Sequence, residues 1–183
     1  MRHSSIFLCL IILMSWGCAD HSAHLETLDK LEAQLAEADS VFIAWPTEAM
    51  EAQRVGVNER LDLVTDLYDN LGDTMDMDLG DYLSKFKGTG KIFKRFGPTY
   101  HRLTDGLATG KKQLEDLRHD LEQGVLGADD AQRFVSDEQR AIGDLHLEIT
   151  RLDTLIKRSM ERYDAMVSKV DSVILDLESR AER

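Results

Sequence analysis

The chain has 183 residues, of which 43% are apolar and 31% charged, and its formal net charge is −12. A chain this acidic repels the phosphate backbone, so we expect no nucleic acid among its partners. Its two prolines permit long uninterrupted helices, and its length suits a single domain.

The first 17 residues have the layout of a secretory signal peptide. A basic start is followed by nine consecutive apolar residues, 6–14. A positive beginning, an apolar run of about 7–15 residues and a small residue before the cut define such leaders. A membrane-spanning helix would need about 18 apolar residues, so we expect residues 1–17 to be removed.

The residue that follows this leader is a cysteine. In the stretch Ser15-Trp16-Gly17-Cys18, the glycine and the cysteine match a lipobox, whereas Trp16 is bulkier than usual. The start thus resembles a bacterial lipoprotein precursor. The resemblance implies that the Cys18 thiol is diacylated, with chains such as palmitate, and that the new amino terminus is acylated. The alternatives are an ordinary secreted protein and an uncleaved anchor with a chance cysteine.

The residues around Cys18 also suggest a location and a domain boundary. By analogy with lipoproteins, Ala19 in place of Asp favours the outer membrane, with the protein facing the periplasm. Cys9 lies in the leader, so the mature chain has one cysteine and no intramolecular disulfide. We expect residues 18–24 to form a tether and residues 25–183 to form one helical domain.

Two amphipathic stripes follow the tether and predict two helices. The first stripe consists of Leu28, Leu31, Leu35, Ala38 and Phe42. The second consists of Met50, Val57, Leu61, Val64, Tyr68 and Leu71. Pro46 lies between them, as either a corner between antiparallel helices or a kink in one long helix, and we favour the corner.

Residues 82–104 interrupt the acidic character of the chain, with six basic residues, no acidic one and interleaved aromatic rings. Their glycines predict a short helix, a turn and a second short helix. Cations beside rings suit an acidic partner or anionic headgroups. The candidate partner-binding or anion-binding residues are Lys85, Lys87, Lys91, Lys94, Arg95, Arg102, Phe93 and Phe96. Alternatively, the rings cap one end of a bundle and the lysines pair with acidic helices of the same molecule.

The last third of the chain predicts an antiparallel helical hairpin. A leucine stripe predicts a helix over residues 98–124, and glycines at 124 and 127 mark its end. A second helix then extends over residues 129–181, capped by Asp129 or Asp130. Its apolar heptads continue over five repeats, as in a coiled coil. The first heptad position is occupied by Ile142, Ile149, Ile156, Tyr163, Val170 and Leu177. The second is occupied by Leu145, Leu152, Ser159, Met166 and Val173.

Together these helices predict an all-α fold, an elongated antiparallel bundle that is coiled-coil-like, with a long C-terminal helix. We expect the first half of the long helix to pack on helix 98–124 and its second half on the N-terminal helices. Alternatively, the second half pairs with another copy in a homo-oligomer.

Motifs for catalysis and metal binding are incomplete. Asp76 begins a sequence that resembles a calcium loop, but Lys87 occupies the position of the essential Glu. Asp116 and His119 have the spacing of a di-metal ligand pair, but no second pair accompanies them. The one mature cysteine is assigned to lipid, so no nucleophile is apparent. We therefore expect no catalytic residue, no metal and no cofactor.

The function that these observations predict is a lipid-anchored, non-enzymatic adaptor or spacer for an envelope protein complex. Its partners would be the membrane, through the lipid, and another envelope protein. One alternative is a ligand-binding or chaperone-like periplasmic bundle that takes a cation, a lipid or an unfolded chain. A self-associating coiled-coil scaffold is another.

Overall fold

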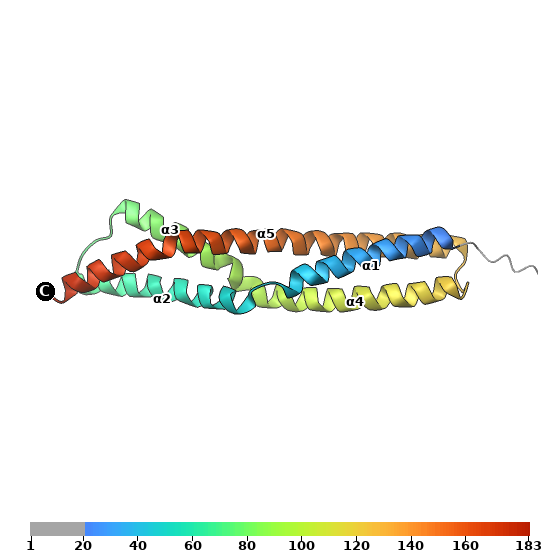
Figure 1. Ribbon diagram of the computed structural model, residues 1–183. Coiled ribbons are helices and arrows are strands. Elements are labelled where there is room, and N and C mark those ends of the chain that lie inside the picture. The colour runs from blue at the N-terminus through green and yellow to red at the C-terminus, as the bar shows by residue number, and fades with distance from the viewer. Residues whose placement is uncertain (1–20) are drawn as a thin grey trace, which may run out of the picture.

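The computed structural model describes residues 21–183, apart from the side chain of Arg95, as an elongated all-helical molecule (Figure 1). No strand occurs in this part of the chain. The elements are α1 (Ser22–Ile43), α2 (Thr47–Leu71), α3 (Met77–Lys91), the 3₁₀ helix η1 (Ile92–Arg95), α4 (Phe96–Glu122) and α5 (Ala128–Ala181). The predicted all-α fold with a long C-terminal helix is confirmed.

Three rows of helix lie side by side along the rod. α5 forms one row by itself, and its 54 residues span about 80 Å at 1.5 Å per residue. α1 and α2 form a second row, in which the chain runs in the same direction as in α5. α3, η1 and α4 form a third row, in which the chain runs in the opposite direction (Figure 1). The predicted hairpin of residues 98–124 and 129–181 is present as α4 and α5.

Each half of α5 is covered by two helices of the same chain. α1 and α4 pack on its first half, and α2 and α3 pack on its second half. The prediction of the packing was therefore right for α4 and α2 and wrong for α1. Because the apolar stripe of α5 continues along its whole length, each half needs cover from two sides. No further copy is needed to cover the second half.

The connection at Pro46 continues a row, and the predicted corner between antiparallel helices is wrong. α1 and α2 do not pack against each other. The backbone N–H of Met50 donates to the carbonyl of Pro46 at 2.9 Å, which begins α2. A corner would place α2 over the half of α5 that α1 and α4 already cover, and would leave the other half in water.

Residues 82–104 are helical throughout, so the predicted turn between two short helices is wrong. Gly88 and Gly90 lie within α3. Gly90 is buried, and a Cβ atom added there would lie 3.4 Å from the Cβ of Val57. This glycine permits a close approach of α2 and α3 and does not end the helix.

The start of α5 also differs from the prediction. Gly127 is its N-cap and makes no side-chain cap, whereas Asp129 and Asp130 lie in the first turn. There their negative charges interact favourably with the helix dipole. Gly124, with φ 62°, turns the chain after α4, in agreement with the predicted break.

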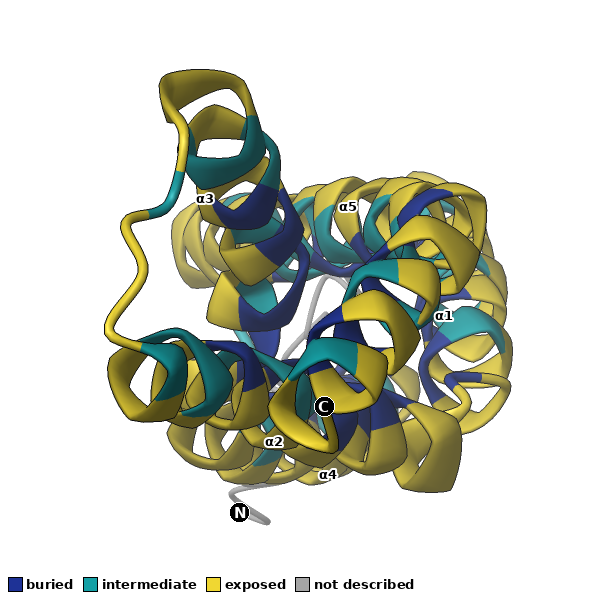
Figure 2. Ribbon diagram, turned by 90° about the vertical axis from the view of Figure 1, so that its left-hand side faces the viewer, coloured by how far each residue is buried: buried dark blue, intermediate teal, exposed yellow. Residues whose placement is uncertain are grey.

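The core consists of two apolar clusters, one in each half of the rod, and the buried residues face inward between the helices (Figure 2). Ile142, Ile149 and Ile156 are at most 1% exposed in the first cluster. Val170 and Leu177 continue the same heptad position in the second. The second heptad position lies at the edge of the core, where Leu145, Leu152, Ser159 and Val173 are half-buried and Met166 is buried.

The beginning of the described chain is held at one end of the rod. His21 is 6% exposed, and its Nε2 atom lies 3.2 Å from the carbonyl oxygen of Leu126 in the α4–α5 connection. Since α1 begins at Ser22, the predicted tether is wrong for residues 21–24. The predicted leader and the lipidation residue Cys18 lie outside the described residues.

Candidate docking surfaces

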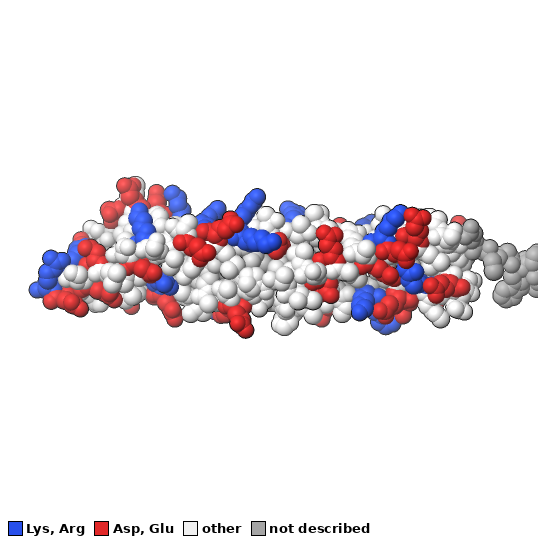
Figure 3. Space-filling model, viewed as in Figure 1, with Lys and Arg blue, Asp and Glu red and all other residues white. Residues whose placement is uncertain are grey.

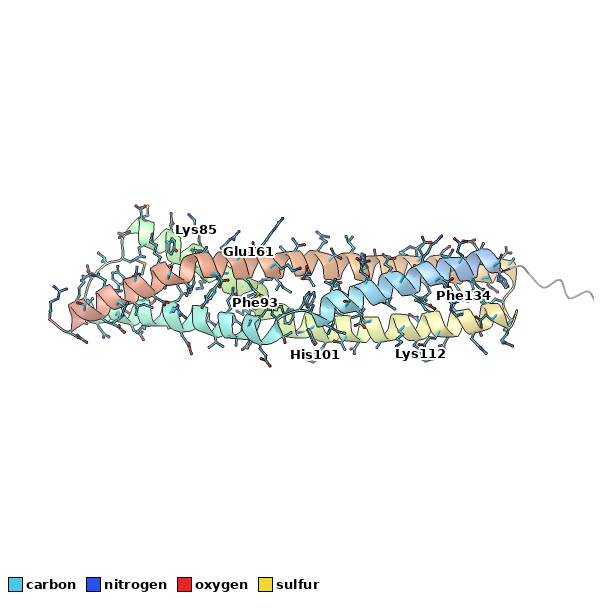
Figure 4. The ribbon with its side chains drawn as sticks, viewed as in Figure 1. Lys85, Phe93, His101, Lys112, Phe134 and Glu161 are labelled. Carbon is cyan, nitrogen blue, oxygen red and sulfur yellow. The ribbon has the colours of Figure 1, made fainter. Side chains whose placement is uncertain are left out.

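Phe93 and Phe96 of segment 82–104 pack in the first core cluster, where the two halves of the rod meet. There η1 faces the break between α1 and α2, and Phe93 lies centrally (Figure 4). Phe93 is 5% exposed, and the ring of Phe96 lies 5.7 Å from that of Trp45 and 5.6 Å from that of Tyr100. Phe93 and Phe96 therefore hold the joint between the two halves. They do not form a docking surface, and they do not cap an end of the bundle.

The lysines of the same segment remain on the surface. The exposed ones are Lys85, Lys87, Lys91 and Lys94. None of them has an ion pair within the part of the chain that the structure describes. Arg102 differs, because it pairs with Glu148 of α5. The alternative prediction, that the lysines pair with acidic helices of the same molecule, is therefore wrong for these four lysines.

A second basic surface lies on α5, and sequence reasoning missed it. We call it the α5 stripe, and it consists of the exposed residues Leu147, Arg151, Leu155, Arg158 and Arg162. Steps of four, four, three and four residues place them on one face of the helix. Basic side chains project along the middle of α5 (Figure 3). Asp153 and Glu161, on neighbouring faces of the helix, offset this positive charge when charges are counted along the sequence. Only the helical spacing of the arginines could therefore have identified the α5 stripe.

A groove of about 820 Å³ lies between α1 and α4. Its apolar lining includes Leu35, Leu107 and Leu114, and charged residues such as Asp39 and Lys111 lie beside them. Ligand sites are commonly apolar clefts of roughly 300–1,000 Å³ with a few polar groups. The groove therefore has the size and the chemistry to receive an apolar group.

A smaller groove of about 400 Å³ lies between α4 and α5 and includes Glu138. The Oε2 atom of Glu138 is buried and has no hydrogen-bond partner. Burial raises the pKa of this carboxyl, and the neighbouring charge of Asp137 raises it further. The side chain is a source of instability when it is ionised.

The described residues contain no candidate metal site and no candidate membrane-spanning helix. Within residues 21–183, no group of three or more His, Cys, Asp or Glu side chains is placed to hold a metal ion. None of the helices there combines the length and the apolar character that crossing a bilayer requires.

No protein-family model matches the chain, and no curated protein or solved structure is significantly similar to it. Inference about function therefore depends on the shape and surfaces of the molecule.

Proposed function

We propose that this protein is a lipid-anchored, non-enzymatic adaptor or spacer of the bacterial envelope, attached through Cys18 to the outer membrane on its periplasmic side. The observation that carries the proposal is the position of His21. It is buried at one tip of the rod, three residues after Cys18. A lipid on Cys18 would therefore hold the tip at the membrane, and the uninterrupted α5 would extend about 80 Å from it.

The exposed lysines of α3 and η1 are the proposed contact for an envelope protein partner. Lys85 projects from α3 in the half of the rod that contains the C-terminal part of α5, and η1 follows α3 towards the middle (Figure 4). Within the described chain these lysines have no ion pairs, so their charge is available to an acidic partner. Complementary charge accelerates association and selects partners.

The lipid anchor is tested by Cys18→Ser in the full-length chain, with Cys9→Ser as the matched control. Cys18→Ser should abolish incorporation of a labelled fatty acid and leave the leader attached, whereas Cys9→Ser should behave as wild type. Labelling that persists in Cys18→Ser would overturn the proposed anchor.

The adaptor role is tested by purifying the tagged protein from native membranes in mild detergent and identifying what accompanies it. We expect one envelope protein at a fixed ratio, and its loss when Lys87, Lys91 and Lys94 are changed to Glu. Reversal of the α5 stripe arginines changes the net charge equally and serves as the control. Recovery of the partner with the lysine variant would contradict the proposed contact.

Ligand binding is the second candidate function, and the groove between α1 and α4 favours an apolar ligand over a cation. Ala36 and Ala108 line this groove, whereas Ala33 is exposed on α1 outside it. If the groove binds lipid, palmitic acid should raise the melting temperature of the wild type. The shift should disappear in Ala36→Arg and persist in Ala33→Arg. An equal shift in all three proteins would exclude the groove.

A further inference from the structure

The arginines of the α5 stripe differ from the other arginines with described side chains. The others form ion pairs or hydrogen bonds, as Arg60 does with Asp171 at 2.7 Å. Arg151, Arg158 and Arg162 have neither within the described chain, and all three are exposed. Leu147 and Leu155 on the same stripe are 55% and 48% exposed. This face of α5 thus combines available positive charge with apolar side chains that water surrounds.

A matching surface of opposite charge lies on α2. We call it the α2 stripe, and it consists of Val55, Glu59, Asp62, Leu63 and Asp66. All five residues are exposed, with Val55 at 37% and Leu63 at 39%, and its carboxylates have no ion pairs in the described residues. Val57 and Val64 are buried on the other side of α2, so the α2 stripe faces solvent.

The two stripes have the same spacing. Leu147 and Leu155 are eight residues apart, as are Val55 and Leu63, which corresponds to about 12 Å along a helix. If the two helices are parallel and these apolar residues are aligned, each residue of α5 has a residue number 92 higher than that of the α2 residue opposite it. The same register places Arg151 opposite Glu59 and Arg158 opposite Asp66.

We propose that the α2 stripe of one copy of this protein docks on the α5 stripe of a second copy. Within one molecule both stripes face solvent, so they do not meet. Apolar side chains would cover each other between copies, and the ion pairs would fix the register. This self-association is independent of the envelope partner proposed above.

The register makes the contact heterologous. In one molecule Gln53 lies level with Ser159, because its amide donates to the Ser159 carbonyl at 3.4 Å. In the proposed contact, Gln53 of one copy would lie level with Leu145 of the other copy. This residue is 14 positions before Ser159, so the two copies are displaced by about 20 Å along the rod. The pair of copies then keeps one free α2 stripe and one free α5 stripe, so assembly is open-ended. The stripes are narrow, so the contact is weak and sensitive to salt.

The test uses full-length protein in mild detergent and measures its mass by analytical ultracentrifugation. At low salt the average mass of the wild type should rise with concentration, and high salt should suppress the rise. Two variants should remain monomeric, namely R151E/R158E/R162E and E59R/D62R/D66R. A mixture of the two should associate again, because the intact stripes are complementary and the reversed stripes, acidic on α5 and basic on α2, are complementary as well.

The variant K87E/K91E/K94E changes the net charge as much as the arginine variant does, and it should associate like the wild type. Circular dichroism checks that each variant is folded, and R151E and E59R replace any triple variant that loses helicity. The proposal is overturned by a monomeric wild type, by association that survives either stripe reversal, or by a mixture that stays monomeric.

Discussion

Phe86 shows how single residues stabilise this rod. Its side chain is 0% exposed, and its ring stacks on Tyr163 of α5 with centroids 5.6 Å apart. Phe134 is also aromatic but is 39% exposed, with the guanidinium of Arg133 lying 4.8 Å from its ring centroid. Because burial of apolar area dominates stability, the two phenylalanines should contribute very differently.

Phe86→Ala should destabilise the fold by about 3–5 kcal/mol, since it removes a large ring and leaves a cavity. Phe134→Ala should cost less than about 1 kcal/mol, because water already surrounds part of that ring. Urea unfolding of the two variants measures both values. Equal losses would show that Phe86 is not part of a tightly packed core.

Glu138 makes stability depend on pH. Its pKa is raised in the folded state by burial, and Asp137 contributes in the same direction. The folded state therefore binds this proton more tightly than the unfolded state, whose pKa is about 4.3. The stabilising effect of protonation is complete below that value and is lost as the pH rises through the folded-state pKa.

Glu138→Gln should raise the melting temperature at neutral pH, and the gain should shrink as the pH falls towards 4. Thermal unfolding across this pH range measures the difference. Glu115→Gln, at an exposed position on α4, is the control and should show no such trend. A gain that is independent of pH would contradict the assigned cause.

At the scale of elements, two glycines of the same helix differ in how closely a neighbouring helix packs against them. A Cβ atom added at Gly88 would have no neighbour within 4 Å, whereas one added at Gly90 would lie against Val57. Both are helical, so their backbones alone do not distinguish them. The sequence predicted a turn at these glycines because nothing in the local pattern shows which helix approaches Gly90.

Gly88→Ala should stabilise the protein by up to about 1 kcal/mol, because alanine has the higher helix propensity. Gly90→Leu should destabilise it by roughly 1–3 kcal/mol or more, since it forces α2 and α3 apart. Gly88→Leu is the matched control for side-chain size. Denaturant unfolding would contradict the packing if both leucine variants were equally stable.

At the scale of the whole molecule, the aromatic joint connects two cores. Trp45 is 4% exposed and contacts Phe42 and Phe96, with ring centroids 4.9 Å and 5.7 Å apart. α5 runs through both cores without a break. We therefore expect the two halves to unfold together.

In the chain without the proposed leader, residues 1–17, Trp45 is the single tryptophan, and its fluorescence reports unfolding of the joint. In this chain, the fluorescence and circular dichroism transitions should coincide in urea, as they do for a two-state protein. Separate midpoints would show that the halves unfold independently. Trp45→Ala in the same background should separate the helical transition into two steps.

The sequence by itself determined the helices and much of the core. The apolar spacing that includes Leu28, Leu35, Ile142 and Ile149 is local, and these residues are buried as the pattern predicted. Helical periodicity identifies the apolar face of each segment before any partner is known. The glycines of the sequence also determined the break after α4, where Gly124 adopts a positive φ.

Only the tertiary structure decided how these faces are paired. The direction of α2 after Pro46 depends on which half of α5 lacks cover. The burial of Phe93 depends on its packing in the cluster that also contains Trp45. The exposure of Arg151, Arg158 and Arg162 depends on which side of α5 the other helices occupy. Packing is non-local, because the hydrophobic effect rewards any burial of apolar area and only the complete arrangement selects the partner.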